Sequence, residues 1–245
     1  MLIINIIMAT LLTSVPYYLS VFTQWSPALA AITIFSMKNS KLRIYSLVTK
    51  TFFRLKYLQW YLISLIIPII ICGITYIFLL IAGIPQWNII KEDFHNSNYV
   101  FYLFIMFFGC YGEEIGWRGF MLPYLRKKHS LFLSSLIIGV CWGLWHLYFK
   151  AGFCGFIIHM IMVIEISFII SWLCTKTNGN IMVATIFHTS FNLFSFIFFK
   201  EIVFAKIVNS QSILSLYGII AISFAPLCIW SIRYMFINQK FQNKK

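Results

Sequence analysis

The sequence predicts an all-α, polytopic membrane protein with about eight transmembrane helices. Of its 245 residues, 61% are hydrophobic and only 10% are charged, and the mean hydropathy is +0.87. Several stretches approach the roughly 20 apolar residues that a helix needs to cross a bilayer. No stretch has the composition of a separate soluble domain, so we expect a single membrane domain.

Residues 1–37 contain no charged side chain. As a helix that rises about 1.5 Å per residue they are too long for one crossing, so we predict a hairpin that turns near residues 24–27. If they cross only once, the total falls to seven helices and only the N-terminus changes side. The first segment lacks a basic n-region and a small-residue cleavage site, so we expect it to be a retained anchor.

Residues 38–56 are basic, and their apolar residues have some helical spacing, which is typical of a helix in the membrane interface. Further apolar stretches predict six transmembrane helices, at residues 58–83, 99–124, 131–149, 152–174, 181–200 and 211–233. The chain shows no internal repeat, so an inverted-repeat transporter is not indicated.

The net charge of +13 comes from basic residues that gather in alternate loops. These residues lie at 38–56, at 126–128, at 176 and in the tail from 233 onwards, and the loops between them are sparsely basic. The alternation is the positive-inside pattern, which places both termini and the basic loops in the cytoplasm. It indicates contact with anionic lipid and not with nucleic acid. We therefore expect a multi-pass protein of the cell membrane.

Three of the six acidic residues, Glu113, Glu114 and Glu165, lie in hydrophobic stretches. An ionised group inside a bilayer costs a few kcal/mol or more, so it rarely occurs without a partner or a task. On a helix, Glu114 and Arg118 lie on one face, whereas Glu113 is turned from Glu114 by about 100°. Arg118 can therefore neutralise one glutamate while the other faces a polar active-site cavity. The alternative is a buried Glu–Arg pair that only fixes helix packing. Glu165 has no motif, and we expect it to serve packing or hydrogen bonding.

Two histidines with neighbouring polar or aromatic residues follow in later apolar stretches. His188 and Asn192 are four residues apart, so they project a pair of hydrogen-bond donors from one helix face. His146 closes the segment Trp142-Gly-Leu-Trp-His146, whose aromatic residues can shield a pocket from water. Taken singly, each histidine is equally compatible with an interhelical hydrogen bond. His159 has no motif, and we expect it to serve packing or hydrogen bonding.

Together these side chains suffice to hydrolyse a peptide bond without a covalent intermediate. A carboxylate and a histidine can hold a water molecule, from which the carboxylate removes a proton. A His–Asn pair on another helix can donate hydrogen bonds to the oxyanion that forms when water attacks an amide carbonyl. Removing one such donor typically costs about 100-fold or more in rate.

Other intramembrane mechanisms are excluded or disfavoured by the residues present. Asp93 is the only aspartate and lies in a loop, so a paired-aspartate protease is impossible. Neither the HExxH zinc motif nor the GxSxG nucleophile motif occurs. We expect no cofactor. The alternative is a zinc ion held by Glu113, His146 and His188, because two histidines and a carboxylate are an established zinc set.

The motifs resemble those of the CAAX protease and bacteriocin-processing family, the intramembrane glutamic endopeptidases that include the type II CAAX prenyl endopeptidases. Three ordered motifs carry the resemblance: Glu113-Glu114 with Arg118, the aromatic segment closed by His146, and His188 with Asn192. The phrases Arg-Gly-Phe-Met-Leu-Pro-Tyr-Leu and Thr-Asn-Gly-Asn-Ile are also similar to the family. The resemblance covers roughly residues 99–200, the expected catalytic core. Residues 1–98 would hold the N-terminal helices and basic loop, and residues 201–245 the last helix and basic tail.

The resemblance implies that Glu113 is the water-activating base and that His146 completes the water site. It implies that His188 and Asn192 form the oxyanion site, and that Glu114 and Arg118 support it. The family's second motif usually opens with Phe. This chain has Trp142 there, a bulkier aromatic residue that can reshape the pocket without removing the histidine.

The predicted helix limits place Glu113 near mid-membrane and His146 near the outer end of its helix. The two side chains can share a water only if one helix is tilted, broken or displaced. A locally irregular helix at residues 99–124 is credible, because irregular backbone is tolerated around a cavity. Four glycines favour it, at positions 109, 112, 116 and 119.

We therefore predict an endopeptidase that hydrolyses a peptide bond near the membrane surface. The resemblance implies either removal of the last three residues of a prenylated C-terminus, or processing and immunity roles around small secreted peptides. The expected partners are the lipid bilayer and a peptide or C-terminally prenylated protein substrate. Two alternatives stay open: a non-catalytic immunity or export-accessory protein, and a small proton-coupled transporter that uses the same Glu and His residues as a relay.

Overall fold

The computed structural model describes residues 21, 23–37, 45, 47, 49–83, 99–149, 151–203 and 210–242. All regular structure within these residues is helical, which confirms the predicted fold class. The elements are α3 (Ser26–Met37), η1 (Leu55–Tyr57), α5 (Leu58–Ile81), α6 (Tyr99–Glu114), η2 (Ile115–Met121), α7 (Leu122–Leu125), α8 (Leu131–His146), α9 (Gly152–Lys176), α10 (Ile181–Val203) and α11 (Ser210–Gln242). Of these, η1 is a short 3-10 helix and η2 is a π-helix.

Several helices have the length and composition to cross a membrane. In the described part of the chain, four qualify: Leu55–Ile81, Gly152–Lys176, Ile181–Phe199 and Ser210–Ile237. α3 and α8 are shorter apolar helices, and α6, η2 and α7 follow one another without a break. The protein is therefore an integral membrane protein of the polytopic, all-α class. The total of about eight transmembrane helices stays a prediction.

The predicted N-terminal hairpin lies only partly within the described residues, because its first arm falls outside them. The amides of Trp25 and Leu29 donate to the carbonyl oxygens of Val21 and Trp25, respectively. Helical hydrogen bonding thus continues through the turn predicted near residues 24–27, and the number of crossings before α3 stays a prediction. The interfacial helix predicted at residues 38–56 is likewise described only in part.

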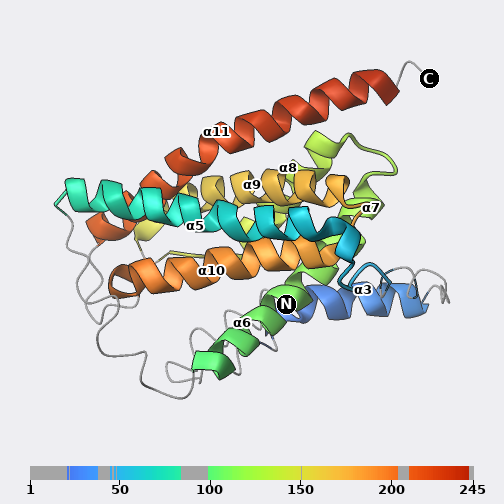
Figure 1. Cartoon of the computed structure of the whole chain (residues 1–245), viewed down its shortest axis with the longest axis horizontal. Coiled ribbons are helices and arrows are strands. Elements are labelled where there is room, and N and C mark those ends of the chain that lie inside the picture. The colour runs from blue at the N-terminus through green and yellow to red at the C-terminus, as the bar shows by residue number, and fades with distance from the viewer. Residues whose placement is uncertain are drawn as a thin grey trace.

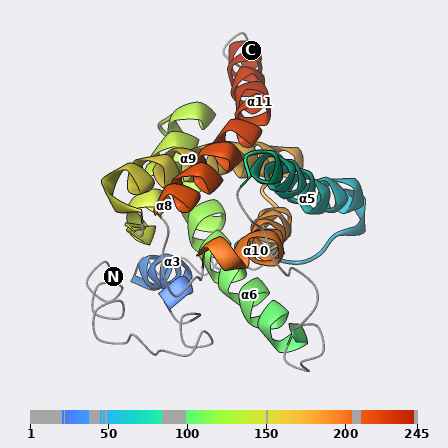
Figure 2. The same ribbon diagram turned by 90° about the vertical axis from the view of Figure 1, so that its left-hand side faces the viewer.

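The long helices share one apolar core. α10 packs against both α5 and α9, and α8 packs against α9 (Figure 1). α11 lies across α9 and α5, while α6 packs against α10 and η2 against α3 (Figure 2). Fully buried side chains from five helices meet in the core, namely Leu79, Ile138, Ile169, Phe187 and Phe224.

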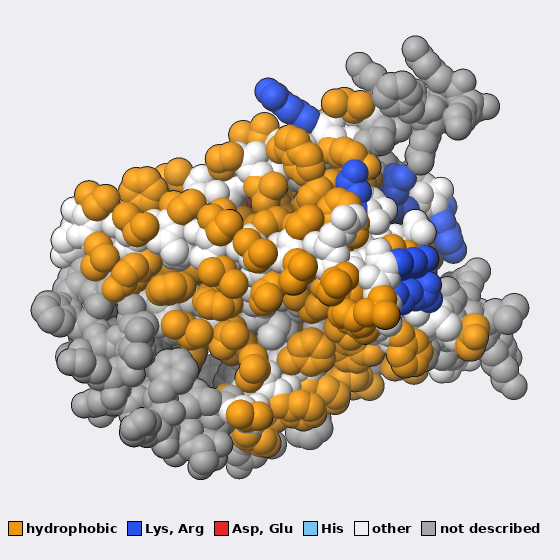
Figure 3. All heavy atoms as spheres, viewed as in Figure 1, with side chains coloured by type: hydrophobic (Ala, Val, Ile, Leu, Met, Phe, Trp, Pro, Cys, Tyr) orange, Lys and Arg blue, Asp and Glu red, His pale blue; other side chains and the backbone are white. Residues whose placement is uncertain are grey.

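The outer surface is also apolar. Hydrophobic side chains cover most of the face shown in Figure 3, and α5 alone exposes Leu62, Ile66, Ile70 and Ile77. Lysine and arginine side chains gather at one end of the molecule. This distribution suits a bilayer, because hydrocarbon accepts apolar side chains and excludes ionised groups.

α3 packs closely on α6 and η2 because glycines line the contact. A Cβ atom at Gly112 would lie 2.7 Å from Cδ1 of Trp25, and one at Gly116 would lie 2.7 Å from the carbonyl oxygen of Pro27. η2 interrupts the regular helix in this region, as π-helical turns often do at functional sites. The irregular helix that the glycine spacing favours is therefore present, directly after the two glutamates.

Candidate active site

The two glutamates stand at the end of α6, where the α-helix gives way to the π-helix η2. Their side chains and that of Arg118 are buried: Glu113 is 1% exposed, Glu114 is 0% exposed and Arg118 is 2% exposed. Charged groups buried to this extent are costly unless they are paired and hydrogen-bonded. The partners come from η2, α8 and α10.

Glu114 is the centre of a buried ionic network. Nη1 of Arg118 donates to Oε1 of Glu114 over 3.0 Å, at the predicted spacing of four residues. Nδ1 of His188, on α10, lies 3.0 Å from the same oxygen. A carboxylate paired with an arginine can only accept, so we assign the proton of this bond to Nδ1. Both donors meet one oxygen, and Glu114 is thereby held between η2 and α10.

Glu113 has a different partner. Its Oε2 accepts a 2.9 Å hydrogen bond from the indole Nε1 of Trp142 on α8. The Trp142 ring also lies 4.6 Å from Cζ of Arg118 and meets the His188 ring edge-on, with 5.0 Å between centroids. Trp142 therefore ties α8 to α6, η2 and α10. The sequence predicts only a bulkier aromatic at this position, whereas the structure shows a hydrogen-bond donor that phenylalanine cannot supply.

His146 is the last residue of α8 and is exposed. Its Nδ1 lies 2.9 Å from the carbonyl oxygen of Trp142, one turn earlier. Leu147 then adopts a left-handed conformation with φ of 43°, which costs a non-glycine residue about 1–2 kcal/mol. The predicted extension of this helix to residue 149 is therefore wrong.

The hydrogen bond from Trp142 to Glu113 links α8 to the end of α6, although the predicted helix limits place Glu113 and His146 at different depths. Trp142 reaches Glu113 directly, and His146 follows Trp142 by one helical turn, about 5.4 Å along the axis. His146 thus lies one helical turn from a residue that contacts Glu113.

Asn192 lies one turn beyond His188 on α10 and is half-buried. Its Nδ2 donates to Sγ of Cys110 over 3.4 Å. Cys110 is fully buried and precedes Glu114 by four residues, so both lie on the same face of α6. Cys110 is not among the predicted site residues, although its spacing of four residues from Glu114 is the signal that could have identified it.

His159 of α9 lies beside His146, with 5.5 Å between the ring centroids. It stacks on Tyr148 at 4.9 Å and meets Tyr217 edge-on at 5.5 Å, so it packs as predicted but also contacts a candidate site residue. Nδ1 of His159 and Oε2 of Glu165 have no hydrogen-bond partner among the described residues.

The zinc alternative requires several ligands around one point. In the described ranges, no group of three or more His, Cys, Asp and Glu side chains is arranged to hold a metal ion. Within the described ranges, Glu113, His146 and His188 therefore do not come together as a metal site.

The six candidate residues occupy one region. The buried cluster contains four of them with Trp142: Glu113, Glu114, Arg118 and His188. The other two lie one turn away along α8 and α10, namely His146 and Asn192. The cluster contains one carboxylate bound by an arginine and a histidine, and another bound by a neutral indole.

Comparison with known proteins supports the resemblance that the motifs predict. Residues 95–194 match the family described as type II CAAX prenyl endopeptidase, Rce1-like, and this range contains all six candidate residues. The chain is also 27% identical over 124 residues to "CAAX prenyl protease 2" of Methanococcus maripaludis. That match covers 46% of this chain and 46% of the relative, so the chain aligns with less than half of the relative's length. Over residues 95–194 the chain is thus similar to the type II CAAX prenyl endopeptidases, as its motifs predict.

Proposed function

We propose that this protein is an intramembrane endopeptidase in which Glu113 activates the attacking water. One observation carries the proposal: two adjacent buried glutamates have different kinds of partner. Glu114 is held by Arg118 and His188, whereas Glu113 accepts from the neutral indole of Trp142. A carboxylate without a bound cation keeps its capacity to take a proton, so Glu113 is the better base.

In the proposed reaction, water attacks the carbonyl carbon of the scissile peptide bond while Glu113 removes a proton from it. The carbonyl oxygen takes up the negative charge, and His146 orients the water. When the tetrahedral intermediate collapses, the C–N bond breaks and the proton on Glu113 passes to the leaving amine. The products are a carboxylic acid and an amine, and the enzyme forms no covalent bond to the substrate.

His188 and Asn192 would stabilise the oxyanion. Nδ1 of His188 is engaged with Glu114, so Nε2 is the nitrogen that remains for the substrate. A doubly protonated imidazole donates from both nitrogens at once. The Asn192 amide contacts Cys110, whose sulfur is a weak acceptor that a charged oxygen would readily replace. Glu114 and Arg118 act as supports, because they fix His188 in place.

We propose a CAAX-type substrate, from which the protein removes the residues that follow a prenylated cysteine. The support is the match of residues 95–194 to the prenyl endopeptidase family and the name of the relative. A prenyl group anchors its cysteine at the membrane surface, which brings the scissile bond to a protein embedded there. The alternative substrate class is a small secreted peptide.

We place the protein in the cell membrane, with its termini and basic loops on the cytoplasmic side. The support is the positive-inside pattern of the sequence and the gathering of lysine and arginine side chains at one end of the helices. Substrate that is prenylated in the cytoplasm would meet the enzyme from that side.

The experiment uses the purified protein and two quenched fluorescent peptides of identical sequence, with and without a farnesyl group on the cysteine. Each is assayed with and without a chelator. We expect cleavage after the farnesylated cysteine, little cleavage of the unmodified peptide and no effect of chelation.

Each other outcome excludes one part of the proposal. Equal cleavage of both peptides would contradict the prenylated substrate, and loss on chelation would contradict a metal-free reaction. No cleavage by the folded protein would favour an immunity or accessory protein in which the buried network only fixes helix packing. Proton-coupled uptake in vesicles would favour the transporter.

A further inference from the structure

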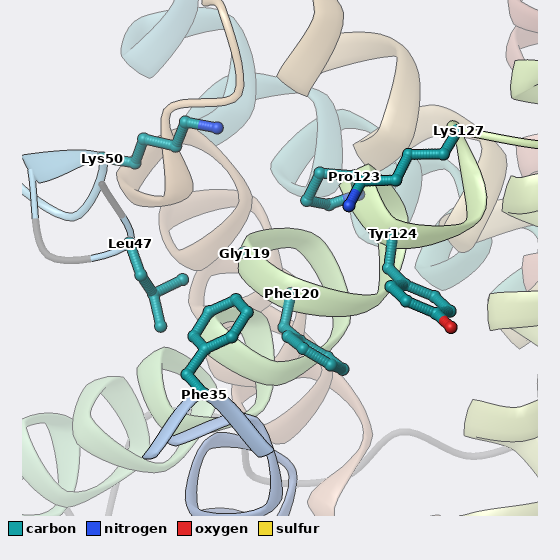
Figure 4. Close-up of a pocket in the computed structure, with 8 residues that line it drawn as sticks. All are labelled: Phe35, Leu47, Lys50, Gly119, Phe120, Pro123, Tyr124 and Lys127. Carbon is teal, nitrogen blue, oxygen red and sulfur yellow. The ribbon is translucent and has the colours of Figure 1, made fainter. Parts of the chain in front are cut away.

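A second site lies at the basic end of the molecule, outside the glutamate cluster. It is a pocket of about 190 Å³ between α3, the residues before α5, and the η2–α7 segment. Three aromatic rings line it, from Phe35, Phe120 and Tyr124, together with the side chains of Lys50 and Lys127 (Figure 4). The site thus combines apolar walls with two cations.

The two lysines make the pocket electropositive. Their side chains extend towards one another from opposite sides in Figure 4. Among the described residues, no carboxylate lines the pocket and every ion pair involves Glu114. The ammonium of Lys127 lies 5.7 Å from the Tyr124 ring, a contact that leaves its charge uncompensated. Two like charges around one space favour an anion between them.

The pocket lies where the apolar surface meets the basic end. Tyr124 is 54% exposed, and Met37 at the end of α3 is 81% exposed. Lysine and arginine side chains gather at one end of the molecule. Tyrosine and exposed apolar side chains next to lysines are typical of the headgroup level of a membrane protein. A ligand with an anionic head and an apolar body matches both parts of this surface.

We propose that this pocket binds the phosphate headgroup of an anionic phospholipid. The phosphate would lie between Lys50 and Lys127, and the acyl chains would follow the exposed apolar surface of α3. Basic pockets between membrane helices on the cytoplasmic side commonly hold such headgroups. The proposal does not depend on peptidase activity. It assigns a lipid ligand to the contact of α3 with η2, the element that carries Arg118.

The test is native mass spectrometry of the full chain in detergent, titrated with phosphatidylglycerol or phosphatidylcholine. The pocket variant is Lys50→Gln with Lys127→Gln. The control variant is Lys56→Gln with Lys128→Gln, which removes the same charge from exposed positions outside the pocket. A melting curve of each variant verifies that it is folded, and the single substitutions provide the comparison if the double variant is not.

We expect the wild type to prefer phosphatidylglycerol, and each pocket lysine to contribute about fivefold to its affinity. The double pocket variant should therefore bind it roughly 25-fold more weakly, while the control variant binds almost as well as the wild type. Inorganic phosphate in excess should not displace the lipid.

Four results would overturn the proposal. Equal losses in the pocket and control variants would indicate a diffuse effect of net charge. Equal binding of the two lipids would exclude recognition of the charge, and displacement by inorganic phosphate alone would indicate a site for a free anion and not for a lipid. Loss of peptide cleavage with unchanged lipid binding would assign the lysines to the substrate.

Discussion

Replacing Arg118 with methionine tests whether the buried network holds the helices together. The substitution keeps an apolar side chain of similar length and removes the 3.0 Å ion pair with Glu114. Both side chains of this pair are 0% exposed. It also removes the contact with the Trp142 ring at 4.6 Å. Glu114 would keep the hydrogen bond from His188. Its buried carboxylate would, however, lose the neutralising charge of the arginine.

The expected loss of folding free energy has two parts: the broken ion pair, and the guanidinium nitrogens that have no hydrogen-bond partner. Breaking a buried ion pair by removing one member typically costs about 3–5 kcal/mol. Nε and Nη2 of Arg118 have no partner among the described residues, so removing the guanidinium also relieves part of its desolvation cost. We therefore expect the free energy of unfolding to fall by about 3 kcal/mol, the lower end of that range.

The assay is reversible unfolding in mixed micelles, followed by circular dichroism. Arg126→Met is the matched control, because Arg126 is exposed and, among the described residues, its guanidinium donates to the carbonyl oxygen of His129. It should change the free energy of unfolding by no more than about 0.5 kcal/mol. Adding Glu114→Gln to Arg118→Met should recover much of the loss, because no unpaired carboxylate remains and glutamine still accepts from His188. Equal effects of Arg118→Met and Arg126→Met would refute the structural role of the pair.

Two further substitutions test single contacts. Trp142→Phe removes the donor to Glu113, so the free energy of unfolding should fall by about 1.5–3 kcal/mol while peptide cleavage persists; complete loss of cleavage in a stable variant would mean that the indole itself takes part in the reaction. Gly116→Ala places a Cβ atom against Pro27 and should lower the free energy of unfolding by about 1–3 kcal/mol. The control is Gly218→Ala, where a Cβ atom would have no neighbour within 4 Å; it should leave the stability unchanged or raise it by up to about 1 kcal/mol through helix propensity. Equal melting temperatures for the two alanine variants would contradict the close packing of α3.

Local spacing accounts for what the sequence predicts well. The Glu114–Arg118 pair has the geometry expected of residues four apart on a helix. The helix limits near residues 131, 152 and 181 also follow from the apolar stretches and the turns between them. These features depend on neighbouring residues alone, so periodicity and composition suffice to predict them.

Contacts between distant segments account for what the sequence does not predict. The hydrogen bond from Trp142 to Glu113 joins residues 29 positions apart. A tryptophan where the family usually has phenylalanine indicates a larger side chain, but it does not indicate which acceptor its N–H contacts. The end of α8 at His146 depends on the left-handed Leu147, a conformation that its residue type disfavours. The contact of His159 with His146 likewise arises from the packing of α8 on α9.

The central claim is that Glu113 takes the proton from the attacking water. It is tested most directly by the cleavage rate of Glu113→Gln against that of Glu165→Gln, an isosteric change at another glutamate in a membrane helix. In Glu113→Gln the amide oxygen can still accept from Trp142, so we expect both variants to keep a free energy of unfolding close to that of the wild type. The amide, however, cannot serve as a base. We expect Glu113→Gln to lose at least about 100-fold in rate and Glu165→Gln to remain active. A Glu113→Gln variant that cleaves at the wild-type rate would contradict the account.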